Sequence, residues 1–266
     1  MSDNTSSLNL PIEVRRSAIL ETLKQREFVR VSDLTRQYHV SEVTIRADLA
    51  WAAQEPGVVR IHGGAMFAPI DGKEPRYEDA VAAHSEQKRR IAVAAAARVN
   101  SGDTVILDVG STTAAVAAAL ANRQDLTDVT VITNSLSNAQ TLEPLIPRFT
   151  VILTGGTLRP LQHSLVEPFA SHIFSSIAAN IAIIGATGVE ATAGITNINL
   201  PESELKRAMV RAATSVVVVA DSTKIGRVDK GRIARVDEVS TLITAGDVDS
   251  DRLDALKSAG LDVVVA

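Results

Sequence analysis

The nine residues Ser41-Glu-Val-Thr-Ile-Arg-Ala-Asp-Leu49 constrain this chain more than any other stretch. Ser41 is a good N-cap, because its hydroxyl can accept a hydrogen bond from one of the unpaired N–H groups at the start of a helix. Ile45, Leu49 and Ala52 follow at helical spacing and predict a buried stripe. The opposite face lacks bulky apolar residues and carries Val43, Thr44, Arg46 and Ala47. We therefore expect an amphipathic helix whose outer face is available to a partner.

The segments around this helix predict a winged helix-turn-helix over residues 12–66. Residues 12–26 and 31–40 read as two further helices, the second capped by Ser32, and a tight turn leads from there to Ser41. Residues 58–65 form a short β-type run ending in a double-glycine turn, which is typical of a hairpin wing. In a helix-turn-helix, the second helix enters the major groove of DNA with an outer face that is free of bulky apolar residues. The residues expected to contact double-stranded DNA are Arg16, Ser41, Val43, Thr44, Arg46, Ala47, Arg60 and His62.

The charge balance means that any DNA binding must come from a local arrangement of arginines and not from the net charge. The whole chain carries a formal net charge of −4, and residues 1–66 hold eight Lys/Arg against eight Asp/Glu. Phosphate contacts dominate the affinity of most DNA-binding proteins. A neutral module must therefore gather its arginines on one face.

Composition sets the class of protein. The 266 residues suit one small and one large domain, and 45% are apolar while only 3% are aromatic, so the core must be built from Val, Ile, Leu and Ala. There is no cysteine, and the histidines show no metal-ligand spacing, so we expect no disulfide, metal or cofactor. No signal peptide or run of ~18 apolar residues is evident, which predicts a cytoplasmic protein that does not enter a membrane.

From residue 84 onward the pattern changes to that of an α/β domain. Residues 67–83, with their prolines and glycine, are expected to be the linker, and residues 84–266 a sensor domain. Short β-branched runs are expected as strands at residues 104–109, 129–133, 150–154, 181–184, 215–220, 241–244 and 262–265. Helical stretches fall between them at residues 85–99, 112–121, 135–143, 201–213 and 251–258. Apolar strands alternating with helices predict a mainly parallel sheet covered on both faces.

Polar residues follow most of the predicted strands. Gly110 to Thr113 open a helix after the first strand, where free N–H groups and hydroxyls suit a phosphate. Because parallel strands end at one edge, we expect these residues to line a crevice for a small phosphorylated sugar or polyol. The expected effector-binding residues are Asp108, Gly110, Ser111, Thr112, Thr113, Asn134, Ser135, Gly155, Gly156, Asp221 and Lys224.

Each of these features can also have an ordinary structural role. The Gly-Ser-Thr-Thr turn is also what an ordinary βα connection looks like, and Lys88 to Arg90 are either a solvated face or a link to the phosphate loop. The rival hypothesis for the whole chain is a sugar-phosphate isomerase-like enzyme with an N-terminal appendage. Its proton-transfer carboxylates would have to be Asp108 and Glu204, and no tight acid/base cluster accompanies them.

The sequence resembles the DeoR-type bacterial transcription regulators. The shared motifs include Ser41-(x)2-Thr-Ile-Arg-x-Asp-Leu49, Arg60-Ile-His-Gly-Gly-Ala65, Asp108-x-Gly-Ser-Thr-Thr113 and Asp221-Ser-x-Lys224, with Lys88 a further match. The resemblance implies a winged helix-turn-helix joined to a sensor that is similar in fold to sugar-phosphate isomerases. It also implies a repressor that forms a homo-oligomer, a dimer or tetramer, and leaves its operator when a phosphorylated sugar or polyol binds. No catalytic residue is expected.

Several positions depart from the family pattern. Ala47 stands where a second arginine is usual, which removes one phosphate or base contact. Ala52 replaces a leucine, with Trp51 beside it, and Pro56-Gly57 replaces a plain glycine–aliphatic pair. Glu167 stands where glycine is common beside the effector pocket, and a carboxylate there would repel a phosphate or select a hydroxyl.

Overall fold

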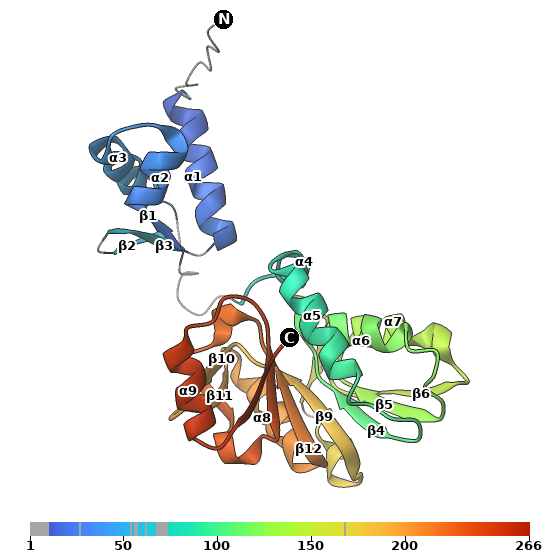
Figure 1. Ribbon diagram of the computed structural model, residues 1–266. Coiled ribbons are helices and arrows are strands. Elements are labelled where there is room, and N and C mark those ends of the chain that lie inside the picture. Colours follow the sequence, from blue (N-terminus) through green and yellow to red (C-terminus); the bar gives the residue numbers. More distant parts are fainter. Residues whose placement is uncertain are drawn as a thin grey trace, which may run out of the picture. The chain divides into compact units, whose positions relative to one another are not determined.

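The computed structural model describes residues 11–26, 28–53, 55, 58–61, 63–67, 74–167 and 169–266. The chain divides into two compact units, Met1–Lys73 and Glu74–Ala266 (Figure 1). Residues 74–83, which the sequence assigned to the linker, therefore lie in the second unit. Pro56, Gly57 and His62 lie outside the described residues.

The first unit contains the elements of a winged helix-turn-helix. Its helices are α1 (Ile12–Arg26), α2 (Val31–Tyr38) and α3 (Glu42–Ala52). Its strands are β1 (Phe28–Arg30), β2 (Val58–Ile61) and β3 (Gly64–Phe67). The strands form an antiparallel sheet in the order β1-β3-β2, so β2 and β3 make the predicted wing hairpin.

Local chemistry explains where these helices begin and end. Ser41 Oγ accepts from the Thr44 N–H at 3.2 Å, so it caps α3 as predicted. The predicted cap of α2 by Ser32 is wrong, because Arg30 holds the cap position and makes no side-chain bond there. His39 ends α2 with a left-handed φ of 53°, which produces the tight turn. The core of the unit is fully buried and includes Ile19, Leu23, Leu34, Ile45, Leu49 and Ala52.

The second unit is organised around a seven-stranded sheet whose paired strands are all parallel. In chain order the strands are β4 (Thr104–Leu107), β5 (Val129–Thr133), β6 (Phe149–Leu153), β9 (Ala179–Gly185), β12 (Ala213–Val219), β14 (Thr241–Thr244) and β15 (Asp262–Val265). They are arranged β15-β14-β12-β9-β4-β5-β6. Each corresponds to one of the seven predicted runs, and the predicted mainly parallel sheet is confirmed.

Helices cover both faces of this sheet. They are α5 (Ser85–Ala96), α6 (Ser111–Ala121), α7 (Leu136–Leu142), α8 (Leu200–Arg211) and α9 (Ser250–Ser258). The short helix α4 (Tyr77–Ala82) precedes α5 and lies against α6. Alternate strand residues separate into two cores: Val105 and Leu107 pack with α5 and α6, whereas Ile106 packs in the core of α8 and α9. This alternation is what a strand buried on both faces requires.

Several smaller elements were not predicted from the sequence. They are the hairpin β7 (Thr157–Arg159) with β8 (Ser164–Val166), and the sheet of β10 (Gly188–Glu190), β11 (Gly194–Asn197) and β13 (Gly231–Ala234). The described residues also contain four 3-10 turns: Glu143–Leu145, His172–Ser175, Ser222–Lys224 and Val236–Glu238. Within the described residues, no helix has the length and apolar character needed to cross a membrane.

Candidate DNA interface and effector site

Helix α3 presents the outer face that the sequence predicted. Val43 is 76% exposed, and Arg46 and Ala47 are exposed beside it. The hydroxyls of Ser41 and Thr44 lie 2.9 Å apart at the start of the helix. Arg46 Nη2 lies 3.1 Å from Glu42 Oε2, one turn earlier on the same exposed face. An exposed pair of this kind is weak, so the guanidinium can exchange this partner for a phosphate or a base edge.

A buried ion-pair network that the sequence did not reveal ties α3 to α1. Asp48, 1% exposed, accepts from Arg15 Nε at 2.6 Å and from Arg16 Nε at 3.0 Å. The Arg16 guanidinium also lies 5.3 Å from the ring centre of Trp51. These contacts give Arg16, which the sequence assigned to DNA, a structural role in orienting the recognition helix.

On the wing, Arg60 pairs with Ala65 in the β2–β3 ladder. His62 lies outside the described residues, so its predicted contact with DNA stays a prediction.

In the second unit the strand order reverses between β4 and β9. From β4 the chain proceeds to β5 and β6 on one side, and from β9 to β12, β14 and β15 on the other. Ligands of open α/β sheets bind outside the carboxyl ends of the strands at such a reversal. Asp108 follows β4 at this point and is fully buried.

Asp108 forms the centre of the site. Its Oδ2 accepts from Lys206 Nζ and, at 2.9 Å, from the N–H of Gly185 at the end of β9. Lys206 Nζ also donates to the Gly185 carbonyl at 3.1 Å. Burial raises the pKa of Asp108 above its ordinary value, and the charge of Lys206 opposes this only partly. Asp108 Oδ1 is buried and makes no hydrogen bond in the described part of the chain, so it is a polar atom whose hydrogen-bonding capacity is unused.

The predicted phosphate loop adjoins this carboxylate. Gly110 has φ of 141°, a conformation that favours glycine, and stands at the N-cap of α6. Thr113 is fully buried and its hydroxyl donates to the Gly110 carbonyl at 2.9 Å, while Thr112 is 8% exposed and Ser111 is half-buried. The loop therefore begins helix α6 shortly after Asp108 in the chain, and the first N–H groups of a helix have no partner within it.

Two asparagines fix the loop from the neighbouring strand end. Asn134 Oδ1 accepts from the Val109 N–H at 3.0 Å, and its Nδ2 donates to the Leu165 carbonyl at 3.3 Å. Asn138 Nδ2 donates to the Asp108 carbonyl at 2.9 Å. Ser135 caps α7 by accepting from the Asn138 N–H at 3.2 Å. Asn134 and Ser135, predicted to bind the effector, thus build the wall of the site.

The double glycine after β6 shapes the next part of the wall. Gly156 has φ of 130°, and a Cβ there would lie 2.2 Å from the Val166 carbonyl oxygen. Glycine is therefore required for the β7–β8 hairpin to fold back. Gly155 is exposed, and Glu167, the departure noted in the sequence, is half-buried at the end of β8.

A second charged group extends the site beyond what the sequence suggested. Arg159 on β7 donates to Glu202 through Nη1 and to Glu74 through Nη2. Glu202, 4% exposed, also accepts from Ser164 Oγ at 2.8 Å. It lies one helical turn before Lys206 on α8, so both side chains face the strand ends. Burial raises the pKa of Glu74, and the bond from Arg159 opposes the rise.

Asp221 and Lys224 form a further cluster after β12. Asp221 is buried, which opposes its ionisation, but the charges of Lys224 and Lys88 and a bond from Thr223 outweigh burial and lower its pKa. Lys88 is 4% exposed and donates to the carbonyls of Ala80 and, at 2.6 Å, Ala83. Lys88 is thus not part of a solvated face, and the link from this helix to the phosphate loop stays a prediction. Lys88 ties the end of α4 to the Asp221 turn.

One carboxylate was assigned wrongly. Glu204, named as a proton-transfer candidate, is exposed and pairs with Arg207 on the outer side of α8. The buried acid is Glu202, and the spacing Glu202-(x)3-Lys206 on one helix face was the signal that could have found it.

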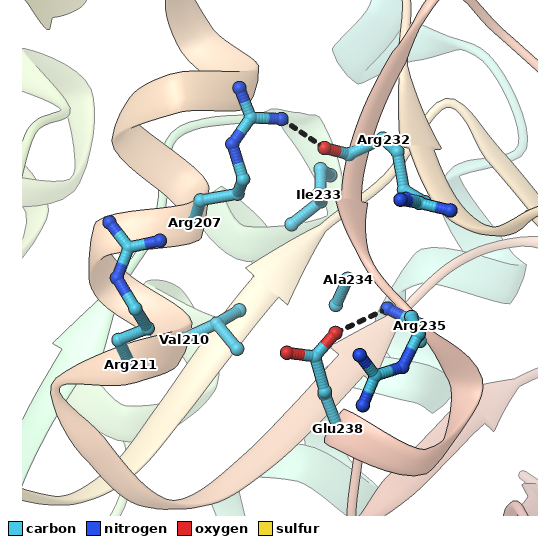
Figure 2. A pocket seen from close by; sticks show the side chains of 8 residues that line it. All are labelled: Arg207, Val210, Arg211, Arg232, Ile233, Ala234, Arg235 and Glu238. Atoms are coloured by element: carbon cyan, nitrogen blue, oxygen red, sulfur yellow. Dashed lines mark hydrogen bonds between the residues drawn. The ribbon is translucent and has the colours of Figure 1, made fainter.

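The outer side of α8 borders a groove of about 450 Å³ that lies apart from these groups. Figure 2 shows Arg207, Val210 and Arg211 of α8 on one side, facing the β13 segment with Ile233, Ala234 and Arg235. Its arginines are partly neutralised, because Arg207 pairs with Glu204 and Arg235 with Asp237.

Two family models match this chain, one within each unit. The DeoR-like helix-turn-helix domain matches residues 15–69, and the DeoR C terminal sensor domain matches residues 83–246.

Curated relatives match over almost their full length. The HTH-type transcriptional regulator GolR of Listeria innocua is 32% identical over 253 residues, covering 95% of this chain and 98% of the relative. The glycerol-3-phosphate regulon repressor of Escherichia coli K12 is 33% identical over 230 residues, covering 85% of this chain and 89% of the relative. The HTH-type transcriptional repressor GlcR of Bacillus subtilis is 30% identical over 253 residues, covering 95% and 96% respectively.

Proposed function

The chain belongs to the DeoR family of transcriptional regulators, and on that basis we propose that it represses genes of carbohydrate metabolism and leaves its operator when a phosphorylated sugar or polyol binds. Family membership confirms the predicted DNA-binding regulator and disfavours the isomerase-like enzyme. One relative is named as the repressor of a glycerol-3-phosphate regulon, and this supports a phosphorylated polyol or sugar as the effector class.

The two tasks divide along the chain. Residues 12–66 bind double-stranded DNA through the exposed face of α3, with Arg46 in the major groove and Arg60 and His62 on the wing. Residues 84–266 bind the effector. Support comes from the exposure of Val43, Arg46 and Ala47, and from the buried network that holds α3 on α1.

The effector site lies at the strand-order reversal, and the single observation that carries it is the buried Asp108–Lys206 pair with Asp108 Oδ1 left unbonded. The effector phosphate rests on the N–H groups of residues 110–113, and Lys206 supplies positive charge. Asp108 accepts a hydroxyl of the ligand. Lys224 and Asp221 contribute from the end of β12, at the far side of the site.

The protein acts as a homo-oligomer in the cytoplasm. One recognition helix reads only a few base pairs, so useful affinity needs at least two copies on half-sites spaced by whole helical turns. Light scattering combined with footprinting of the operator tests this. A monomer that occupies one half-site tightly contradicts it.

A thermal-shift screen of the full chain with C3–C6 sugar and polyol phosphates tests the effector site. A ligand at ~100 times its dissociation constant stabilises the unit that binds it by roughly 2.7 kcal/mol. The shift should disappear in Lys206→Met and in Thr112→Val, and persist in Arg89→Gln, an exposed arginine on α5 paired with Glu86. Steady isomerisation of any of these compounds favours the enzyme instead.

A further inference from the structure

Arg159 pairs with two carboxylates, Glu202 and Glu74, and the two differ in how many other contacts hold them in place. Its side chain is 19% exposed, that of Glu202 is 5% exposed and that of Glu74 is 12% exposed, so all three groups are largely removed from water. Buried charges of this kind are stable only while each keeps its partner. If one partner leaves, an anion must replace it.

Glu202 is the fixed member of this group. Besides Arg159 it accepts from Ser164 Oγ at 2.8 Å and from Asn197 Nδ2 at 3.4 Å. It also stands in the first turn of α8, where Asn199 caps the helix by accepting from the Glu202 N–H. Its position is set by three elements at once.

Glu74 is the displaceable member. It is the first residue of the second unit and belongs to no helix or strand. Among the described residues, Arg159 is its hydrogen-bonding partner and it makes no second side-chain bond. Breaking one contact therefore frees this carboxylate, whereas Glu202 would lose several.

The charges around Arg159 argue that an anion enters only by replacing a carboxylate. The connected groups are three acids, Glu74, Glu202 and Asp108, and two bases, Arg159 and Lys206. Adding a phosphate to this set places another negative charge in a poorly solvated site. Exchanging it for the Glu74 carboxylate keeps Arg159 paired, and guanidinium binds phosphate oxygens in the same forked geometry.

We propose that Arg159 is an effector-contacting residue and that Glu74 occupies its anion position in the ligand-free protein. The inference rests on the proposed function, since the competing ligand is the effector at the strand ends. Binding then releases the start of the second unit, which is continuous in sequence with the DNA-binding unit. Between Pro75 and Glu78 the remaining contacts are made to the β7–β8 hairpin: Gln162 donates to the Pro75 carbonyl, the Tyr77 N–H donates to Leu161 O at 3.0 Å, and Glu78 lies 3.5 Å from His163 Nε2. The end of α4 stays anchored by Lys88, which donates to the carbonyls of Ala80 and Ala83.

The test uses inorganic phosphate as the probe and titration calorimetry on the full chain at fixed ionic strength. Glu74→Gln removes the competitor while keeping its size, and should tighten phosphate binding about tenfold if Glu74 fills the position nine-tenths of the time. Asp79→Asn is the matched control, because Asp79 is an exposed carboxylate of the same segment, and it should bind phosphate like the unaltered chain. Arg159→Gln should weaken binding.

Hydrogen exchange of the unaltered protein supplies a readout that needs no variant. Phosphate should speed exchange of the amides of residues 77–83, and in Glu74→Gln these amides should already exchange fast without phosphate. Equal phosphate affinity in the unaltered chain and Glu74→Gln, with binding lost in Lys206→Met, overturns the competition while leaving the effector site intact. No phosphate binding to either protein overturns the effector site as well.

Discussion

Lys206 donates through Nζ to the fully buried carboxylate of Asp108, which lies 98 residues away in the sequence. The two meet because β4 and β9 are neighbours at the point where the strand order reverses, and Lys206 on α8 reaches both Asp108 after β4 and the Gly185 carbonyl at the end of β9. Taking two charges out of water is costly, so the pair marks a site that is kept for more than stability.

The raised pKa of Asp108 makes a prediction about pH. Because the folded state holds this proton more tightly than the unfolded chain, its contribution to the free energy of unfolding falls as pH rises above the ordinary value of 3.8. Asp108→Asn removes that dependence. The stability of this variant relative to the unaltered chain should therefore increase between about pH 4 and 7, measured by urea unfolding at each pH.

Asp125→Asn is the control for this series. The bond from Arg123 lowers the pKa of Asp125 to about 2, so it does not titrate in the same pH window. A slope in Asp108→Asn that matches the slope of the unaltered chain would show that Asp108 keeps an ordinary pKa in the fold.

The network at Asp48 should dominate the stability of the DNA-binding unit. Asp48→Ala takes the carboxylate from Arg15 and Arg16 and should cost about 3–5 kcal/mol, the usual result of breaking a buried pair. Trp51 is the single tryptophan of the chain, so its fluorescence reports on this unit during unfolding. Asp33→Ala, which breaks an exposed pair with Arg36, should cost less than about 1 kcal/mol. Similar costs for the two would mean that α3 is held by apolar packing alone.

The variant Arg46→Ala distinguishes two modes of DNA binding. If its guanidinium reads a guanine edge, Arg46→Ala should cost about 1–3 kcal/mol and relax the preference at one base pair. If it contacts phosphate only, affinity should fall equally on all sequences and the salt dependence should become shallower. Anisotropy titrations at several salt concentrations distinguish these results, and unchanged binding would exclude α3 as the reader.

Gly156 should tolerate no side chain. Gly102 has φ of 84°, and a Cβ added there would meet no other atom within 4 Å, so Gly102→Ala should cost only the conformational term of about 1–2 kcal/mol. Gly156→Ala adds a Cβ 2.2 Å from the Val166 carbonyl oxygen and should cost more, and it should also weaken phosphate binding. Thermal unfolding followed by circular dichroism compares the two variants, and equal costs would show that the hairpin shifts freely.

The elements that could be predicted from the sequence are those with a strong local signal. All seven strands of the parallel sheet stand where the sequence has a short run rich in β-branched residues, and the α3 helix begins at Ser41 because a hydroxyl caps it. The loop at residues 110–113 also has a strong local signal, because a glycine followed by hydroxyl residues is typical of the start of a helix.

The contacts that could not be predicted join residues far apart in the chain. Arg159 meets Glu74 across 85 residues, and Arg15 meets Asp48 across 33, and a single charged residue gives no sign of such a partner. Glu202 and Glu204 look alike in sequence, yet two residues along a helix point to opposite sides, so one is buried beside Lys206 and the other faces solvent.

The most direct test is the affinity of the full chain for a duplex recovered by in vitro selection, measured with and without each C3–C6 sugar or polyol phosphate. Coupling between sites is typically 1–3 kcal/mol, so one of these compounds should weaken DNA binding by about 5–150-fold. The effect should vanish in Lys206→Met, whose DNA affinity without ligand stays unchanged. DNA affinity that no compound alters, or a full response in Lys206→Met, would contradict the assignment of the switch to the Asp108–Lys206 site.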